Sequence, residues 1–254
     1  MSAPSEPPPV RISLARARCR CVAEIAGVLV AAMLLTEWLV RRDADLRLAR
    51  QFYDAARGGW FLGDTPPWGW LYRYGPWPAL ALAGGGLVAL GVMWWRKNWR
   101  GWRTAAFLPL LMLLGPGLVV NAVLKEHWGR PRPRQLTEFG GEKLGLPELY
   151  LPPWQRGMAG GGRFSFPSGH ASMGFFLMGP FFLLRHSRRR SAAWLALGGG
   201  AAAGLVMGFA RITQGGHFLT DVLWAGVVVF VCGRLLEHAF FAGLGNEAGR
   251  STRP

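Results

Sequence analysis

The stretch RFSFPSGHASMGF, residues 163–175, runs from a polar turn directly into an apolar segment. Ser168 is a favourable N-cap residue for a helix that begins here, and Gly169 lets the backbone come close to a ligand. The first turn of such a helix offers unpaired N–H groups and the positive end of the helix dipole, which together bind anions. His170 stands in this first turn. It is either a structural residue or one that acts on the bound anion, and the rest of the chain has to decide between the two.

The composition is that of a membrane protein. The chain has 254 residues, of which 51% are hydrophobic and only 17% are charged, and its mean hydropathy is positive. Ordinary soluble domains combine fewer apolar residues with more charges. A chain of this length accommodates one compact domain built from several membrane-spanning helices.

Crossing the ~30 Å hydrocarbon core of a bilayer takes about 20 mostly apolar residues in a helix. The segments that meet this requirement are Val22–Val40, Trp77–Trp95, Thr104–Leu124, Ser168–Leu184, Ser191–Ala210 and Phe218–Leu236. The first of them lacks a clear small-residue cleavage site, so we interpret it as an uncleaved helix. We therefore predict an all-α, polytopic membrane protein with six transmembrane helices. Residues 22–240 form its transmembrane domain, residues 125–167 its third extramembrane loop, and residues 1–21 and 241–254 its cytoplasmic tails.

Basic residues between the spans indicate the orientation. The loop RKNWRGWR, residues 96–103, and the loop RHSRRR, residues 185–190, carry four Lys or Arg residues each, and the N-terminal tail is also basic. The positive-inside bias places all of these segments in the cytoplasm. We therefore predict a multi-pass protein of the cell inner (plasma) membrane whose loops 41–76, 125–167 and 211–217 face the periplasm or the exterior.

The first of these outer loops contains the segment DADLRLARQFYDAAR, residues 43–57. Its pattern predicts an amphipathic helix lying in the membrane interface. A helix within a solvated loop is the alternative interpretation.

The net charge of +15 results from 29 Lys and Arg residues against 14 Asp and Glu residues. Such an excess is typical of proteins that bind nucleic acid or an anionic membrane surface. Here the arginines lie mostly between apolar runs, so we predict a phospholipid bilayer and no nucleic acid as partner. The third loop is nonetheless basic, and its cations are Lys125, Arg130, Arg132, Arg134, Lys143, Arg156 and Arg163. Positive charge on this side runs against the bias, and anion binding would explain it.

The cysteines are Cys19, Cys21 and Cys232. They show neither a disulfide framework nor the spacing of metal ligands, so we predict reduced thiols. The sequence predicts no metal site and no cofactor.

A second polar stretch is KEHWGRPRP, residues 125–133, where the third predicted span ends. Lys125 and Arg132 are fixed cations, and prolines on both sides of Arg132 hold its backbone extended. The planar fork of arginine matches phosphate oxygens, whereas lysine acts as a point charge. A cationic cluster at the end of a span is also typical of side chains that snorkel to the membrane interface.

A third polar stretch is ARITQGGHFLTDVLWAG, residues 210–226. His217 and Asp221 are four residues apart and would share one face of a helix. A carboxylate beside an imidazole fixes its tautomer and leaves the other ring nitrogen to attack, and Gly215-Gly216 would give that nitrogen room. An ionisable residue within an apolar run, as Asp221 is, indicates function. A structural His–Asp pair is the alternative.

Hairpin topology brings the three stretches to one face of the membrane, because the third and fifth spans end where the fourth and sixth begin. Two histidines, an aspartate and several cations then meet at one level. This combination favours an active site for a phosphate group over separate structural roles.

Taken together, the stretches resemble the type 2 phosphatidic acid phosphatase superfamily, and within it the membrane lipid phosphatase branch with its bacterial lipid A phosphatases. The motifs are Lys125, six residues and Arg132-Pro133; Pro167-Ser168-Gly169-His170; and Arg211, five residues, His217, three residues and Asp221. Their order and spacing are those of the family. Its members include membrane lipid phosphatases, glucose-6-phosphatase, soluble bacterial acid phosphatases and vanadium haloperoxidases.

The resemblance implies that His217 attacks phosphorus to form a phosphohistidine, that Asp221 orients it, and that His170 protonates the leaving oxygen. It also implies that no metal takes part. The implied substrate-binding residues are Lys125, Arg132, Ser168, Gly169 and Arg211.

The chain departs from the family pattern at Ala210, where a serine usually precedes the arginine. The change removes one expected hydroxyl contact. Arg130 also precedes a proline, but the six-residue gap selects Arg132. Arg130 is expected to assist.

We therefore predict an integral-membrane, metal-independent phosphatase that hydrolyses a lipid phosphomonoester or diphosphate on the periplasmic face. Candidate substrates are lipid A, undecaprenyl diphosphate and phosphatidylglycerophosphate. The segment RPRQLTEFGG, residues 132–141, resembles lipid A phosphatases. The alternatives are a lipid-to-lipid phosphotransferase and a non-catalytic, anion-binding transporter. No obligate protein partner is predicted.

Overall fold

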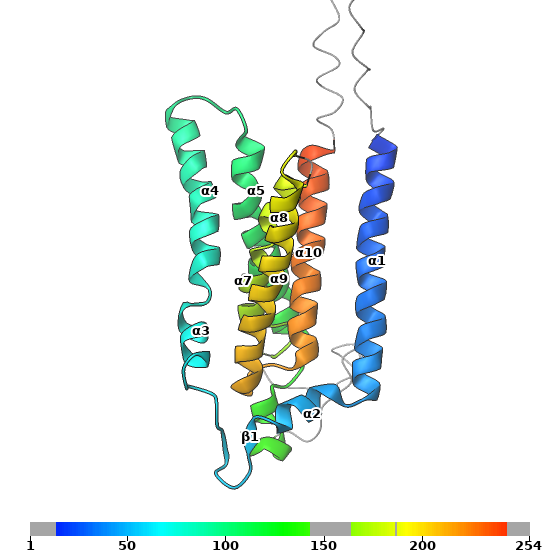
Figure 1. Ribbon diagram of the computed structural model, residues 1–254, viewed down its shortest axis with the longest axis vertical. Helices are drawn as coiled ribbons and strands as arrows, with labels where there is room; N and C mark the ends of the chain where they lie inside the picture. The colour runs from blue at the N-terminus through cyan, green and yellow to red at the C-terminus, as the bar shows by residue number, and fades with distance from the viewer. Residues whose placement is uncertain (1–13, 143–163, 186, 243–254) are drawn as a thin grey trace, which may run out of the picture.

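The computed structural model describes residues 14–142, 164–185 and 187–242. The predicted tail residues 1–13 and 243–254, and the part of the third loop that holds Lys143, Arg156 and Arg163, lie outside the described residues. Within the described part, the chain forms a bundle of long helices with short elements gathered at one end (Figure 1).

Five helices in the described residues are long and apolar enough to cross a membrane. They are α1 (Leu14–Arg41), α3 with α4 (Trp68–Tyr74 and Trp77–Trp95), α5 with the π-helical η1 and α6 (Trp102–Met112, Leu113–Leu124 and Lys125–His127), α9 (Arg190–Thr213) and α10 (Leu219–Phe241). The first four each contain one of the predicted spans, and the bounds of α4 are those predicted. α10 contains the last predicted span except for Phe218, which is its N-cap residue. α1 begins at Leu14, before the predicted Val22, because the basic segment continues the helix.

The fourth predicted span, Ser168–Leu184, is divided into two short helices, α7 (Gly169–Phe176) and α8 (Gly179–Leu184). Pro180 stands in the first turn of α8 and cannot donate the hydrogen bond that would continue α7. At 1.5 Å per residue the two helices extend roughly 24 Å, less than the ~30 Å hydrocarbon core. The segment lies inside the bundle (Figure 1), where α7 packs against α9, α10 and η1. The fourth predicted span is therefore a shorter, broken segment surrounded by other helices.

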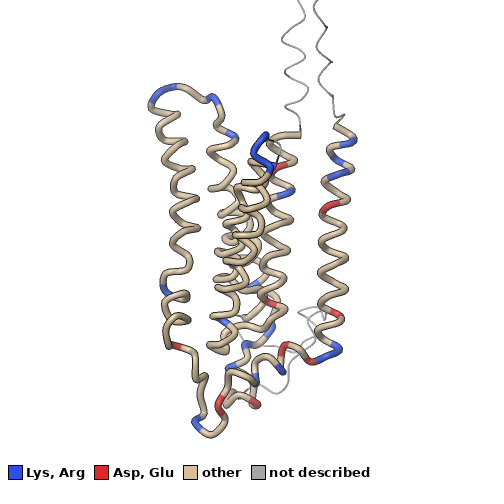
Figure 2. The backbone as a smooth tube through the Cα atoms, in the orientation of Figure 1, with Lys and Arg blue, Asp and Glu red and all other residues tan. Residues whose placement is uncertain are grey.

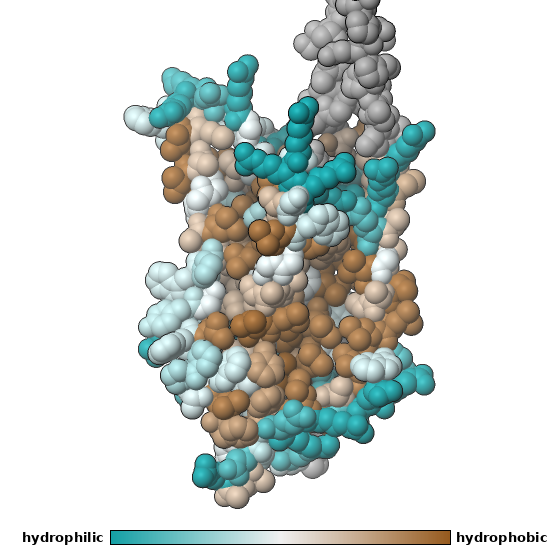
Figure 3. Space-filling model, viewed as in Figure 1, coloured by the Kyte–Doolittle hydropathy of each residue, from teal (hydrophilic) through white to brown (hydrophobic). Residues whose placement is uncertain are grey.

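Charge separates along the long axis of the bundle. Lys and Arg residues gather at both ends, and the middle of the helices is almost free of charged residues (Figure 2). The space-filling view shows an apolar belt between two hydrophilic ends (Figure 3). Such a belt matches the hydrocarbon core of a bilayer. The chain is therefore a multi-pass membrane protein, as predicted.

Short elements between α1 and α4 cover the end of the bundle opposite the described termini (Figure 1). They are α2 (Ala44–Arg50) and the hairpin strands β1 (Tyr53–Asp54) and β2 (Gly59–Trp60), and α3 follows them and leads into α4 at the side of the bundle. We refer to residues 44–74 as the cap. The cap lies within the predicted outer loop 41–76, and α3 is a helix that was not predicted in that loop.

The amphipathic helix predicted over residues 43–57 is confirmed only for α2. The side chain of Asp54 accepts hydrogen bonds from the backbone N–H groups of Ala56 and Arg57, at 3.0 and 3.2 Å. Gly58 then adopts a left-handed φ of +63°. These local interactions compete with helical hydrogen bonds, so the chain turns into the β1–β2 hairpin.

Small residues let α7 pack closely on α9. A Cβ atom built at Gly204 of α9 would stand 2.3 Å from the ring of Phe175, and one at Gly200 would stand 2.2 Å from the backbone nitrogen of Met178. Close approach at small residues is how helices associate in a bilayer. It fixes the first turn of α7 beside the end of α9.

Ion pairs fasten α1 to the bundle near the end that holds the termini. Glu24 of α1 accepts two hydrogen bonds from Arg185, at 2.9 and 2.7 Å, and one from Arg234 Nε at 2.8 Å. Arg234 also pairs with Glu237 at 3.3 Å. The charge of Glu24 makes the first predicted span less apolar, and the two arginines balance that charge within the protein.

Replacing Gly204 with alanine should lower thermal stability, because the added methyl group enters the ring of Phe175. Overpacking of this kind costs about 1–3 kcal/mol. The matched control is Gly198→Ala on the same helix, where an added Cβ meets nothing within 4 Å. That change should leave stability equal or slightly higher. Melting curves of the purified variants in detergent test this, and equal midpoints for the two variants would contradict it.

Candidate active site

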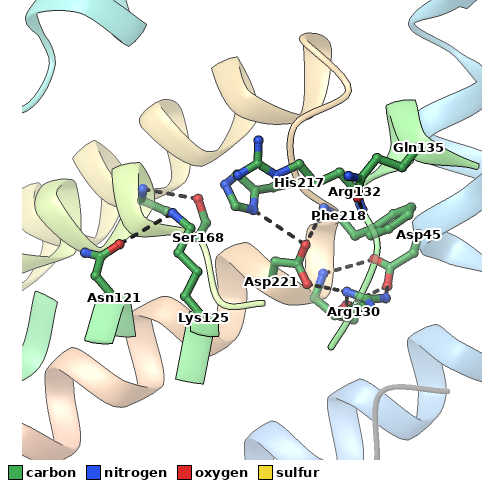
Figure 4. Close-up of polar contacts among 12 residues, drawn as sticks. Asp45, Asn121, Lys125, Arg130, Arg132, Gln135, Ser168, His217, Phe218 and Asp221 are labelled. Atoms are coloured by element: carbon green, nitrogen blue, oxygen red, sulfur yellow. Dashed lines mark hydrogen bonds and ion pairs between the residues drawn. The ribbon is translucent and has the colours of Figure 1, made fainter. Parts of the chain in front are cut away.

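The three polar stretches meet at the capped end of the bundle (Figures 1 and 4). They are the segment that follows α6, the start of α7, and the connection between α9 and α10. All the site residues predicted from sequence lie there, namely Lys125, Arg132, Ser168, Gly169, His170, Arg211, His217 and Asp221. His170 is close enough to interact electrostatically with Lys125, Arg211 and His217.

Ser168 is the N-cap of α7, as predicted. Its extended backbone, with φ −73° and ψ 112°, precedes the first helical turn, and its hydroxyl oxygen accepts a hydrogen bond from the N–H of Ala171 at 3.4 Å. The N–H of Ser168 donates to the carbonyl of Asp221 at 3.1 Å. This bond ties the start of α7 directly to the first turn of α10.

Glycine is required at position 169 because Lys125 and Asn121 lie against it. A Cβ atom there would stand 2.7 Å from Asn121 Oδ1 and 3.3 Å from Lys125 Nζ. Asn121 in turn accepts a hydrogen bond from Lys125 Nζ at 3.4 Å. The ammonium group is therefore held beside the N-terminus of α7, where two sources of positive potential add up.

His217 and Asp221 are both buried at the start of α10. His217 Nδ1 lies 3.7 Å from Asp221 Oδ2, which also accepts a hydrogen bond from the N–H of Phe218 at 2.8 Å. The imidazole therefore directs Nδ1 towards the carboxylate, which leaves Nε2 as the nitrogen for chemistry.

Burial lowers the pKa of His217 to about 4, against the raising effect of Asp221. Buried, low-dielectric surroundings disfavour the charged ring. His217 is then neutral at neutral pH, the form in which an imidazole is a nucleophile.

The glycines before His217 serve neighbours other than the attacking nitrogen. Gly215 has φ +60° and packs against the ring of Trp60, and a Cβ atom at Gly216 would stand 2.5 Å from Arg211 Nη2. The sequence analysis expected these residues to give His217 room. The structure uses the space for the cap and for the Arg211 guanidinium.

Arg130 forms a buried ion-pair network that the sequence analysis did not predict (Figure 4). Its guanidinium pairs with Asp221 Oδ1, donates to Thr220 Oγ1 at 2.9 Å and pairs with Asp45 Oδ2 at 2.7 Å. Thr220 also donates to Asp45, from its backbone N–H at 3.0 Å and from its hydroxyl at 2.5 Å. Arg130 is only 1% exposed, so its assistance to the site takes the form of holding Asp221.

Arg130 offsets part of the negative charge of the two carboxylates, and they in turn stabilise its positive charge. Burial by itself would lower the pKa of Arg130, but Asp221 and Asp45 more than offset it, and the pKa is raised. Asp45 comes from α2 in the cap. The cap therefore contributes a charged residue to the structure behind the His217–Asp221 pair.

Arg211 is nearly buried at the end of α9. Its guanidinium lies 4.5 Å from the centre of the Tyr72 ring and hydrogen-bonds to the side chain of Gln214, which donates to the carbonyl of Gly63 at 2.7 Å. Arg132 and Arg134 are near enough to repel it electrostatically. Cations accumulated in this way attract an anion.

Ala210 is buried. It occupies the position where the family pattern described above usually has a serine. Its carbonyl accepts a hydrogen bond from the hydroxyl of Thr213 at 2.9 Å. Within the described ranges, no group of three His, Cys, Asp or Glu residues is arranged to hold a metal ion.

Membrane helices that carry two histidines, an aspartate and clustered cations at one end define a class of membrane protein built to act on an anionic group. A sequence model described as the PAP2 superfamily matches residues 104–243. The chain belongs to the PAP2 superfamily, and its relatives there are named phosphatases, so the resemblance, the all-α membrane fold and the enzyme class predicted from sequence are confirmed.

Relatives in this family carry phosphatase names. A "Lipid A 4'-phosphatase" from Francisella tularensis subsp. novicida (strain U112) is 32% identical over 82% of this chain and 90% of its own length. One from Rhizobium leguminosarum is 38% identical over 47% of this chain and 48% of its own length. A "Phosphatidylglycerophosphatase B" from Bacillus subtilis (strain 168) is 28% identical over 54% of this chain and 56% of its own length.

Among solved structures, the chain is similar to the transmembrane PAP2 type phosphatidylglycerolphosphate phosphatase from Bacillus subtilis. The TM-score is 0.45 at 19% identity, and the alignment covers 90% of this chain and 97% of that chain.

Replacing Arg130 with methionine should destabilise the protein strongly, because Asp221 and Asp45 would remain buried without their counter-ion. Breaking a buried pair from one side costs about 3–5 kcal/mol. Asp45→Asn in the same chain should recover part of the loss. Arg134→Met, at an exposed position two prolines further along the same stretch, is the control and should change the melting midpoint little. Equal midpoints for the two arginine variants would rule out the structural role of Arg130.

The ring of His217 should stay neutral until the pH falls to about 4. The unfolded chain would bind this proton near the ordinary value of 6.5, so acidification from pH 6.5 towards 4 should also favour unfolding. Nitrogen-15 NMR of imidazole-labelled protein in detergent measures the titration, with the His217 signal identified by its loss in His217→Ala. A midpoint near 6.5 would contradict the burial described here.

Proposed function

We propose that this protein is an integral-membrane lipid phosphatase that hydrolyses a phosphomonoester of lipid A through a phosphohistidine intermediate. The observation that carries the proposal is the meeting of Lys125, Arg211 and the N-terminus of α7 around His170 and His217. Family membership supports the reaction class. The relative from Francisella, similar over most of both chains, supports lipid A as the substrate.

The phosphate would be bound by cations and by main-chain donors. Lys125, Arg132 and Arg211 neutralise its oxygens, and the hydroxyl of Ser168 with the N–H of Gly169 adds hydrogen bonds. Donors that are fixed before the substrate arrives stabilise the charge that develops during phosphoryl transfer without having to reorganise. The close contacts of Gly169 with Lys125 and of Gly216 with Arg211 support this preorganisation.

In the first step, Nε2 of neutral His217 attacks phosphorus and forms a P–N bond. The P–O bond to the lipid breaks, and the leaving oxygen takes a proton from the imidazolium of His170. Asp221 stabilises the positive charge that builds up on His217. Protonation of an alkoxide leaving group typically contributes about 10²–10⁴-fold to the rate.

In the second step, a water molecule attacks the phosphohistidine. Neutral His170 accepts a proton from this water, the P–N bond breaks, and inorganic phosphate leaves. His217 returns to its neutral form and His170 to its protonated form, so the cycle closes with one water consumed.

The membrane environment of the site suits a lipid substrate. The site lies at one end of the apolar belt, at a level where a lipid carries its headgroup (Figures 1 and 3). The opposite end carries the basic loops 96–103 and 185–190. With the positive-inside bias, we place that end in the cytoplasm and the active site on the periplasmic face of the inner membrane.

Phosphatidylglycerophosphate is the second candidate substrate, because a relative carries the corresponding name at 28% identity. Both lipids present a phosphomonoester at the membrane surface. The large, anionic saccharide head of lipid A suits the additional arginines 132 and 134 beside Arg211, which makes it the first choice.

The purified protein in detergent should release inorganic phosphate from lipid A faster than from phosphatidylglycerophosphate or undecaprenyl diphosphate. His217→Ala should lower this release by at least about 10³-fold, because the nucleophile is lost while the binding cations remain. Released phosphate is measured directly, and lipid products are separated by mass.

Phosphate found on a second lipid instead of in solution would identify a phosphotransferase. Lipid A binding without product, unchanged in His217→Ala, would identify a non-catalytic anion-binding protein. Full turnover in His217→Ala would overturn the assignment of the nucleophile.

A further inference from the structure

Tyr72, on α3 in the cap, contacts the site from outside the family-matched residues 104–243. Its ring stacks on the imidazole of His170, with centres 4.6 Å apart and planes inclined by 24°. The guanidinium of Arg211 lies 4.5 Å from the centre of the same ring. One aromatic side chain thus contacts a phosphate-binding cation and a histidine from different helices.

These contacts are more specific than core packing. The Tyr72 side chain lies at the surface, with the residue 45% exposed, so its burial contributes little to the stability of the bundle. The main chain of Tyr72 also hydrogen-bonds to the ring of His170. α3 is therefore positioned so that both the backbone and the ring of Tyr72 contact the same histidine.

Residues of the cap that precede α3 hold this helix in place. Gln214, which hydrogen-bonds to Arg211, also donates to the carbonyl of Gly63 in the segment just before α3. Trp60 packs on Gly215 of the adjoining loop. Arg211 is consequently fixed on one side by this loop and on another by the Tyr72 ring.

The face of an aromatic ring carries negative potential and attracts cations. In the proposed reaction, His170 must carry a positive charge before it protonates the leaving oxygen, although the charges of Arg211 and Lys125 are close by. A ring that faces both Arg211 and His170 favours the charged form of each and offsets part of their mutual repulsion.

We propose that Tyr72 is a positioning residue for phosphoryl transfer, holding Arg211 towards the phosphate and supporting the protonated form of His170. This inference rests on the proposed function, because it assigns a part of the leaving-group step to the ring. It predicts that the aromatic ring matters and that the phenolic hydroxyl does not.

The experiment compares Tyr72→Leu, which removes the ring, with Tyr72→Phe, which keeps it. Tyr74→Leu, at a more exposed tyrosine of the same helix, is the matched control. Melting curves establish that all variants are folded. For each, kcat/KM is measured with p-nitrophenyl phosphate, whose leaving group needs no proton, and with lipid A in detergent, whose sugar alkoxide does.

We expect Tyr72→Leu to lose about tenfold more kcat/KM on lipid A than on p-nitrophenyl phosphate, since only the former needs general acid catalysis. Tyr72→Phe should stay within about twofold of the unaltered protein on both, because the ring face is kept. Binding of orthovanadate, a mimic of five-coordinate phosphorus, should weaken about threefold in Tyr72→Leu through Arg211. Tyr74→Leu should change none of these quantities.

The outcomes separate the two proposals. Equal losses on both substrates with unchanged orthovanadate binding, or a loss in Tyr72→Phe as large as in Tyr72→Leu, would overturn the role of Tyr72 while leaving the phosphatase intact. If the unaltered protein releases phosphate from no lipid, the proposed function fails, and orthovanadate binding still decides whether the ring holds Arg211.

Discussion

The buried attraction between Arg130 and its two carboxylates is the interaction on which the site depends. Arg130 joins Asp45 of the cap to Asp221 of α10, and the N–H of Ser165, in the segment before α7, donates to the Arg130 carbonyl at 2.8 Å. Charges buried in this way are tolerated only when they neutralise one another. The network therefore fixes the position of Asp221, and with it His217, relative to the first turn of α7.

A second group of charges consists of cations that lie close to one another. Lys125, Arg132 and Arg211 bring like charges together at the N-terminus of α7, where the helix dipole adds further positive potential. Folding alone gains nothing from such repulsion, and local conflicts of this kind mark functional sites. The Arg130 ion pairs fix the positions of Asp221 and His217, and the clustered cations create the positive potential that the proposed function assigns to phosphate binding.

Hairpin topology made the grouping of the site predictable from sequence, because consecutive spans must end and begin at the same membrane level. The contribution of the cap was not predictable. Asp45 and Arg130 are separated by 85 residues, and no local pattern relates them. Tyr72 belonged to a predicted loop, and the turn at Asp54 overrode the helical periodicity of residues 43–57. Such features depend on tertiary contacts, which propensity and hydropathy do not encode.

The division of the fourth span into α7 and α8 has a consequence for biogenesis. A segment this short, broken by Pro180, does not span the hydrocarbon core by itself, and it packs among the helices around it. It must therefore enter the bilayer together with α9, which follows it from the ribosome and packs on it through glycines. His170 meets Arg211 and His217 only after the chain has been synthesised past α9.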